Sequence, residues 1–231
     1  MRTPAFGWRD YWRMLTSGRP SLPWRYFREA HAYDLRRGTD THARLNKEDF
    51  GAAPAGFAEG TCYTASWTSE IDWAFRETLA LLGPEFDAFA FVDVGCGKGK
   101  AVLRWTELCR RAGSAQRIAG FDYHAPLVEI ARRNHVKLFG TPGRITTDGA
   151  ETFAFAPLGG RVLCYLYNPF GADLMRRFLR RLDGLDVVVI YNNPVEDAAL
   201  RDLGFVVWRS KQGDCPAART TLYANRRAAA N

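Results

Sequence analysis

Residues 91–100 read Phe-Val-Asp-Val-Gly-Cys-Gly-Lys-Gly-Lys, and this stretch decides the fold that the sequence predicts. Apolar residues enter it from Phe89, one acid interrupts them, three glycines stand at alternate positions, and a helical pattern begins at Ala101. This order is typical of a strand, a tight turn and a helix. Glycines let a ligand approach the backbone closely, and the first turn of the helix offers unpaired N–H groups. We therefore expect a small molecule to bind at this turn.

The spacing of the glycines excludes two common phosphate-binding motifs. A dinucleotide fingerprint requires a glycine five positions after the first one, and that position after Gly95 holds Lys100. A P-loop requires Ser or Thr directly after its lysine, and Ala101 follows Lys100 instead. The carboxylate of Asp93 favours a ligand that carries a cation, such as an ammonium group.

In these residues the sequence resembles the class I S-adenosylmethionine-dependent methyltransferases, whose first motif runs strand, acid, x, Gly-x-Gly-x-Gly, helix. The resemblance extends from about Gly60 to Arg226. It implies S-adenosylmethionine as the cofactor, S-adenosylhomocysteine as the product, and a glycine loop as one wall of the cofactor site. The residues of this wall are Asp93, Gly95, Cys96, Gly97 and Gly99. A glycine turn in another kind of α/β protein is the alternative interpretation.

The composition predicts a globular protein without a metal centre. The 231 residues suffice for one domain with an extension or for two small domains, and a hydrophobic content of 47% is ordinary. The sequence contains no early apolar run and no stretch as long as a membrane span, so we expect a cytoplasmic protein. The five cysteines lack a C-x-x-C pair, and the four histidines form no cluster with ligand spacing.

Residues 1–60 are predicted to form a basic, aromatic helical extension, joined through a linker at 51–56 to a domain over 61–231. Within this extension, residues 1–44 carry a net charge of +5, which is most of the total of +7. Dispersed solubilising charge is the favoured explanation, and nucleic-acid binding is the alternative. Two short amphipathic helices are predicted, whose aromatic faces we expect to pack on the main domain rather than bind bases. These faces contain Trp8, Tyr11, Trp12 and Leu15, then Trp24, Phe27, His31 and Leu35.

Beyond residue 60, predicted strands and helices alternate. A helix begins after N-cap residues at 66–70 and ends at Gly83-Pro84. The strand before Gly95 is followed by strands at 117–121, 143–147, 161–167, 186–191, 205–209 and 220–225, with helices to about 111 and over 126–138 and 172–182. The predicted fold class is therefore α/β: a doubly wound, mostly parallel seven-stranded sheet with an antiparallel last strand, plus the N-terminal helical extension.

Acids at the ends of the second and third strands are candidates for cofactor binding, because ligands of doubly wound sheets lie at the carboxyl ends of the strands. Asp122 ends the strand at 117–121, where a carboxylate can accept both ribose hydroxyls, and Tyr123 beside it can lie against the adenine. The resemblance places Asp148, followed by Gly149, near the adenine amino group. A helix N-cap for Asp122 and a turn for Asp148 are the alternatives.

The fourth strand ends in Asn168-Pro169-Phe170, the candidate catalytic residues. These residues resemble the Asn/Asp-Pro-Pro-Tyr/Phe motif of N-methyltransferases, which binds a substrate amine, although the second proline is missing. An asparagine holds a neutral amine without adding a charge that would keep the amine protonated. An Asn-Pro turn that merely ends a strand is the alternative.

A looser likeness extends to bacterial relatives of the non-SET lysine methyltransferases. It implies that Gly38-Thr-Asp-Thr41 and Tyr63-Thr-Ala-Ser66 fold over the cofactor as a lid, with Tyr63 as a cofactor contact. The second element departs from the expected Tyr-x-Pro-Thr at Ala65 and Ser66. Asn192-Asn193-Pro194 either lines the acceptor pocket or forms a turn.

The favoured function is transfer of a methyl group to an amine nitrogen of a small molecule or a protein side chain. An RNA methyltransferase is a second class, and a cofactor-binding protein without catalysis is a third. For a hydroxyl acceptor in a small molecule, a base is required, and His124 is the candidate. The expected partner is the methyl acceptor, with nucleic acid not favoured and no membrane. The oligomeric state is not predicted.

Overall fold

The computed structural model describes residues 8–17, 21–42, 44–45, 60, 63–213 and 219–225, so the predicted linker at 51–56 lies outside the described residues. A π-helical turn, Phe27–His31, joins the second and third helices. The helices are α1 (Trp8–Thr16), α2 (Leu22–Tyr26), α3 (Ala32–Arg37), α4 (Thr68–Leu82), α5 (Lys100–Ala112), α6 (Ala125–Phe139), α7 (Ala172–Arg180) and α8 (Asp197–Asp202). The strands are β1 (Arg44–Leu45), β2 (Tyr63–Thr64), β3 (Ala90–Val94), β4 (Ile118–Asp122), β5 (Arg144–Thr147), β6 (Arg161–Tyr167), β7 (Asp186–Asn192), β8 (Val206–Gln212) and β9 (Arg219–Ala224).

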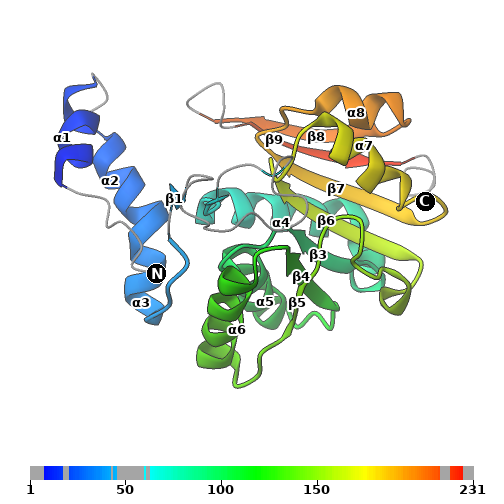
Figure 1. Ribbon diagram of the computed structural model, residues 1–231, viewed down its shortest axis with the longest axis horizontal. Coiled ribbons are helices and arrows are strands. Elements are labelled where there is room, and N and C mark those ends of the chain that lie inside the picture. The colour runs from blue at the N-terminus through cyan, green and yellow to red at the C-terminus, as the bar shows by residue number, and fades with distance from the viewer. Residues whose placement is uncertain are drawn as a thin grey trace.

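The main sheet has seven strands in the order β5-β4-β3-β6-β7-β9-β8 (Figure 1). The neighbours from β5 to β7 pair in parallel, whereas β9 is antiparallel to both β7 and β8. The predicted mostly parallel seven-stranded sheet with an antiparallel last strand is therefore confirmed. Because the order reverses between β3 and β6, the carboxyl ends of these strands border a crevice in which ligands of such sheets bind.

Helices cover both faces of this sheet, and the alternation of side chains along β3 shows why. Val92 points into a core cluster with α7 and α8, whereas Phe91 points to the opposite face, against α4 and α5. A third cluster packs α6 against α5 and β5 through Val102, Val128 and Ile145. Apolar side chains on both faces of a strand are typical of a parallel strand buried between two helical layers.

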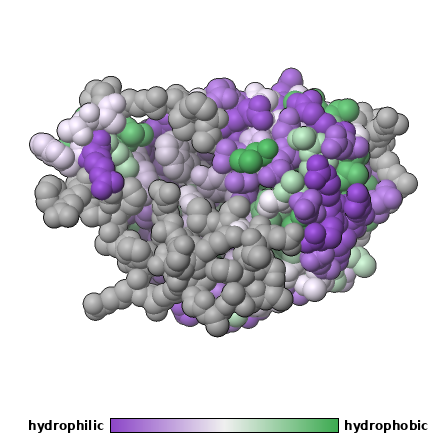
Figure 2. All heavy atoms as spheres, turned by 45° about the horizontal axis from the view of Figure 1, so that its top comes forward, coloured by the Kyte–Doolittle hydropathy of each residue, from purple (hydrophilic) through white to green (hydrophobic). Residues whose placement is uncertain are grey.

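The surface is strongly charged where α7 lies. Leu174, Met175 and Phe178 bury one face of this helix, and arginines occupy the opposite face. Figure 2 shows hydrophilic residues gathered at the end of the molecule that carries α7 and α8 in Figure 1. Among the described residues, no helix combines the length and the apolar character that a membrane span requires.

The N-terminal extension is helical as predicted, but the expected packing of its aromatic face is wrong in part. Trp12, Trp24 and Leu35 are 62%, 68% and 71% exposed, while Tyr33 is buried. The π-helical turn Phe27–His31 lies between Trp24 and Leu35 and has more residues per turn than an α-helix. A 3.6-residue pattern extended across that turn therefore marks the wrong face for Trp24 and Leu35, whereas Trp12 lies in α1, before the turn.

The first turn of α4 is capped from a distant part of the chain, which corrects the prediction of a local N-cap. Trp67 holds the N-cap position and makes no side-chain capping bond. Instead, the buried carboxylate of Glu29 accepts a hydrogen bond of 2.9 Å from the Ser69 N–H. A carboxylate at this end also interacts favourably with the helix dipole.

Asp34 organises the turn after α3, which brings the chain to the glycine loop. Its carboxylate accepts hydrogen bonds from the Thr41 N–H and the His42 N–H, at 2.9 and 2.8 Å. The turn then presents Asp40 to the buried ammonium of Lys98 in the glycine loop, at 2.7 Å. The extension is thus joined to the loop by charge as well as by packing.

Tyr63 lies directly on the glycine loop. A Cβ added to Gly97 would come within 2.0 Å of the Tyr63 ring, and Gly97 has a φ of +51°. The Tyr63 hydroxyl donates a hydrogen bond of 2.7 Å to the carbonyl oxygen of Thr41. Gly97 is therefore required both for its backbone conformation and for the space that the tyrosine ring fills.

A core substitution tests the packing of α5 on the sheet. Trp105 is fully buried, stacks on Phe91 with 4.2 Å between ring centroids, and donates a hydrogen bond to Gln116. Trp105→Ala should lower the free energy of unfolding by about 3–5 kcal/mol, because it leaves a cavity and removes the hydrogen bond to the Gln116 amide oxygen. The exposed Trp12→Ala is the matched control and should change it by less than about 0.5 kcal/mol in urea denaturation. Equal effects of the two substitutions would contradict this core.

The contact between Gly97 and Tyr63 predicts strong coupling in a double-mutant cycle. Gly97→Ala should destabilise the wild-type protein through its left-handed backbone and its collision with the ring. In the Tyr63→Ala background only the backbone effect remains, so the loss in unfolding free energy should be smaller by at least about 1 kcal/mol. Chemical denaturation of the four proteins measures this difference. Additive effects would show that the ring does not rest on Gly97.

Candidate functional site

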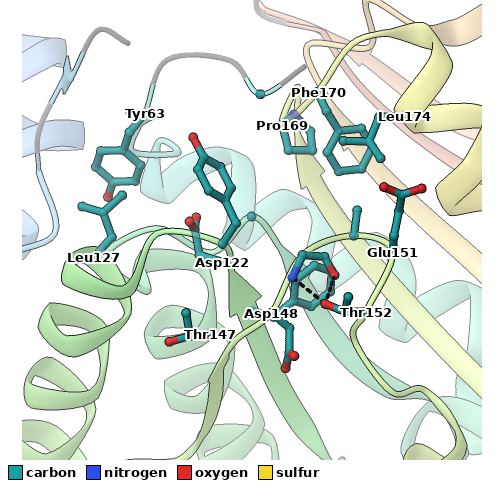
Figure 3. Close-up of a pocket in the computed structure, with 16 residues that line it drawn as sticks. Tyr63, Asp122, Leu127, Thr147, Asp148, Glu151, Thr152, Pro169, Phe170 and Leu174 are labelled. Carbon is teal, nitrogen blue, oxygen red and sulfur yellow. Dashed lines mark hydrogen bonds between the residues drawn. The ribbon is translucent and has the colours of Figure 1, made fainter. Parts of the chain in front are cut away.

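A cavity of about 400 Å³ opens at the carboxyl ends of β3, β4, β5 and β6, and we call it the main cavity. Figure 3 shows Tyr63, Asp122 and Leu127 on one side of it, with Pro169, Phe170 and Leu174 on the other. Its predicted members are Tyr63, Gly95, Asp122, Tyr123, Asp148, Gly149, Pro169 and Phe170. The structure thus brings residues from five separate predicted motifs into one cavity of the size usual for small-molecule sites.

Asp122 ends β4 and is buried beside the glycine loop. Its two carboxylate oxygens accept hydrogen bonds from the Gly97 N–H at 2.9 Å and from the His124 N–H at 2.8 Å. Burial raises the pKa of this carboxyl to about 6, against the effect of the two N–H donors, which lower it. The side chain therefore holds the loop in place and still faces the main cavity.

The opposite end of the main cavity is built by the turn after β5. Asp148 and Gly149 line it, and the Gly149 N–H donates a hydrogen bond of 2.9 Å to the Thr152 hydroxyl (Figure 3). This bond closes the turn that carries Asp148. The two predicted acids, Asp122 and Asp148, therefore face the same cavity from adjacent strands.

A smaller cavity of about 50 Å³ adjoins the glycine loop and contains two groups of opposite charge. Asp93 and Lys100 both line it, together with Gly95, Cys96 and Tyr63. Burial raises the pKa of the Asp93 carboxyl to about 8, and the charge of Asp122 adds to this effect. Burial also lowers the pKa of the Lys100 ammonium to about 8. Because Gly95 and Tyr63 line both cavities, the two cavities adjoin each other.

Asn168 stands at the end of β6 in a left-handed conformation with a φ of +42°. Its side-chain oxygen accepts a hydrogen bond of 3.3 Å from the Tyr191 hydroxyl. Among the described residues, those that line the main and small cavities include Pro169 and Phe170 but not Asn168. Asn168 therefore borders the site, with its amide directed toward β7.

The remaining sequence candidates take structural positions around the cavities. Gly99 is the N-cap of α5 and packs against Ala131, and His124 is buried at the N-cap of α6. Asn192 is also buried, and its amide contacts Tyr165 and Thr220 at 3.4 and 3.5 Å. These contacts direct the Asn192 side chain into a buried polar network.

Several lining residues were not predicted from the sequence. The sequence could have indicated Lys100, because it is a charged residue directly after the third glycine of the motif. The others belong to no distinctive motif, because small, polar or apolar residues beside a turn are common. They are Gly60, Phe121, Leu127, Thr147, Ala150, Glu151, Thr152 and Leu174. In the part of the chain that the structure describes, no group of His, Cys, Asp and Glu side chains is arranged to hold a metal ion.

Comparisons with known proteins identify the fold. A scan against protein-family models finds no match, and a search of the curated proteins finds no similar sequence. Among solved structures, monomeric WbdD matches with a TM-score of 0.52 and 16% identity, covering 68% of this chain and 41% of that chain. Another structure of WbdD is described as that of a bifunctional kinase-methyltransferase.

Two further solved structures match over larger shares of their own chains. Magnesium protoporphyrin IX methyltransferase (ChlM) from Synechocystis PCC 6803, with bound S-adenosylmethionine, has 14% identity, a TM-score of 0.49, and coverage of 89% of this chain and 96% of that chain. The ribosomal protein L11 methylase from Lactobacillus delbrueckii subsp. bulgaricus has 15% identity, a TM-score of 0.47, and coverage of 69% and 78%. The strand order and the likeness to WbdD together show the Rossmann-like fold of the class I S-adenosylmethionine-dependent methyltransferases.

Proposed function

We propose that this protein is an S-adenosylmethionine-dependent methyltransferase that acts on an amine nitrogen. The observation that supports this most is the main cavity, where the glycine loop, Asp122 and Asp148 meet at the carboxyl ends of three adjacent strands. A phosphate-bearing cofactor would meet two carboxylates there. An uncharged nucleoside with a cationic tail suits the same groups.

The described residues fit the three parts of this cofactor. Asp122 lines the main cavity and would accept the ribose hydroxyls, and Tyr123 and Leu127 line it too and would supply surface for the adenine. Asp148 lies on the adjacent strand end, in the position that the resemblance gives to the adenine amino contact. In the small cavity, Asp93 suits the amino group of the methionine end, and Lys100 suits its carboxylate.

The cofactor supplies an electrophilic methyl group, and it leaves as S-adenosylhomocysteine. The protein chain binds and orients the cofactor and the methyl acceptor, and it excludes water from the site. Phe170 and Leu174 provide an apolar wall at the acceptor side of the main cavity. The Tyr191 hydroxyl donates a hydrogen bond to the Asn168 amide oxygen, and we propose that the same amide oxygen also accepts a substrate N–H. A neutral amine then requires no dedicated base.

The role of Asp122 predicts a loss of cofactor affinity. Asp122→Ala should raise the dissociation constant for S-adenosylhomocysteine at least about tenfold, a loss of about 1.4 kcal/mol or more. The carboxylate loses its ribose contacts, and the Gly97 N–H loses its acceptor. Isothermal titration calorimetry measures this constant, with the exposed Asp202→Ala as the matched control. Unchanged affinity in a folded Asp122→Ala protein would remove Asp122 from the site.

The role of Asn168 predicts lost turnover with retained cofactor binding. Asn168→Gly is the informative substitution, because glycine keeps the left-handed backbone and deletes only the amide. We expect turnover to fall at least about a hundredfold, within the range for loss of one hydrogen-bonding group that stabilises a transition state. Asn193→Gly is the matched control, since Asn193 also has a positive φ at a strand end.

The assay is incubation of cell extract with methyl-labelled S-adenosylmethionine, followed by mass spectrometry of the labelled product. The labelled product identifies the acceptor molecule and the atom to which the methyl group was transferred. Label on nitrogen supports the amine assignment, and label on oxygen contradicts it. Full labelling by Asn168→Gly would show that the amide takes no part.

A further inference from the structure

A second large cavity lies outside the proposed methyl-transfer site, between the N-terminal extension and the helices α4 and α5. Its volume is about 420 Å³. The π-helical turn and α3 form one wall, and the first turn of α4 with one side of α5 forms the other. Figure 1 shows α3 on the side of the molecule where α5 and α6 lie. We call this space the arginine cavity.

Positive charge dominates the lining of this cavity. Five arginines face two carboxylates, those of Glu29 and Asp72. Arg36 and Arg111 are exposed at its rim, and neither forms an ion pair with any described residue. The five arginines are Arg28, Arg36, Arg37, Arg104 and Arg111. An anion is therefore the ligand that the charges favour.

A carboxylate network fixes the inner arginines. Arg104 donates two hydrogen bonds to Asp72, at 2.6 and 2.8 Å, and one to Glu107 at 2.9 Å. Arg37 binds the same Glu107 carboxylate through two of its nitrogens, one of them at 2.9 Å. Burial raises the pKa of Glu107, but the bonds from Arg37 and Arg104 outweigh it and hold the pKa below its ordinary value. The guanidinium groups are thus charged and oriented before any ligand binds.

Three buried hydroxyl groups point to a ligand with acceptor oxygens. Tyr33 lines the cavity and is only 3% exposed, yet its hydroxyl has no hydrogen-bond partner among the described residues. The Thr68 and Ser69 hydroxyls, also in the lining, are buried and equally lack a partner within the described part of the chain. A buried polar group without a partner costs about 1–3 kcal/mol, and three in one cavity require an explanation.

We propose that the arginine cavity binds a terminal phosphate group carried by a small molecule. The planar guanidinium groups match phosphate oxygens in pairs, and the three hydroxyls supply neutral donors deeper in the cavity. The first amides of α4 are not the main attraction, because Glu29 already accepts the Ser69 N–H. Side chains, rather than backbone amides, would therefore bind the phosphate.

The depth of the hydroxyls distinguishes a small ligand from a nucleic acid. A phosphodiester backbone on the surface would contact the arginines at the rim but would not reach the buried Tyr33 hydroxyl. A terminal phosphate can enter between the two walls and accept a hydrogen bond from that hydroxyl. The Tyr33 ring is held in place by Arg37, whose guanidinium carbon lies 4.1 Å from the ring centroid.

The cavity also adjoins the proposed cofactor site through Glu29. The side chain of Glu29 lines the arginine cavity, and its backbone oxygen accepts a hydrogen bond of 2.6 Å from Lys100. Lys100 in turn lines the small cavity with Asp93. A ligand in the arginine cavity would therefore lie close to the glycine loop, although its binding does not depend on methyl transfer.

The test is calorimetric titration of the full chain with inorganic phosphate at constant ionic strength and without any methyl donor. We expect saturable binding with a dissociation constant of about 1 mM or tighter. The double variant Arg36→Gln/Arg111→Gln should weaken it at least about tenfold. The matched control Arg133→Gln/Arg180→Gln removes two exposed arginines elsewhere and should leave it unchanged. Absence of saturable binding, or equal weakening in the control, overturns the proposal.

Tyr33→Phe separates a terminal phosphate from a nucleic-acid backbone. Because the hydroxyl lacks a partner, its removal should leave the melting temperature unchanged and weaken phosphate binding about fivefold or more. A second titration uses a short single-stranded RNA without a terminal phosphate. The proposal is overturned if phosphate fails to bind while this RNA binds in a way that depends on Arg36 and Arg111 but not on Tyr33. The cavity rim would then be a nucleic-acid-binding surface rather than a small-molecule site.

Discussion

The carboxylate of Asp122 joins three parts of the molecule through two backbone hydrogen bonds. It ends β4, accepts the N–H of Gly97 in the glycine loop, and accepts the N–H of His124 at the start of α6. Because a carboxylate has about four acceptor positions, two remain for a ligand. The same side chain therefore shapes the loop and lines the main cavity. A change at Asp122 would alter both the shape of the cavity and the groups that it offers to a ligand.

From Gly97 the packing continues into the N-terminal extension. The Tyr63 ring rests on Gly97, its hydroxyl donates a hydrogen bond to the Thr41 carbonyl, and the Thr41 N–H donates one to Asp34 in the first turn of α3. Asp40, within the same turn, pairs with Lys98 of the loop. The Asn134 side chain of α6 accepts a hydrogen bond from the Asp40 N–H and donates one to the Asp40 carbonyl oxygen. The extension is thus a structural part of the site, because it supplies the cover of the glycine loop.

The sequence predicted features that depend on local pattern, and it missed those that depend on distant pairs. The sheet and the placement of Asp122 and Asp148 were predictable, because parallel strands bring their carboxyl ends to one edge. Glu29 capping Ser69 was not, since the two residues lie 40 positions apart. The exposure of Trp24 was also missed, because a π-helical turn interrupts the period on which the prediction relied.

Burial of two acids sets the charge that the cofactor site prefers. The pKa values of Asp93 and Asp122 rise from 3.8 to about 8 and about 6, mainly through loss of water around the carboxylates. An acid with a raised pKa binds more protons in the folded than in the unfolded state. Its contribution to stability therefore falls as the pH increases from about 4 through the raised values.

A cationic ligand offsets this penalty, because it stabilises the charged form of Asp93 at the pH where the empty site is least stable. An anionic ligand adds to the penalty instead. The same two carboxylates that weaken the folded protein at neutral pH thus select against phosphate at the glycine loop. The proposed cationic ligand and the proposed phosphate would thus bind in separate cavities of one chain, the first beside Asp93 and the second among the arginines near α3.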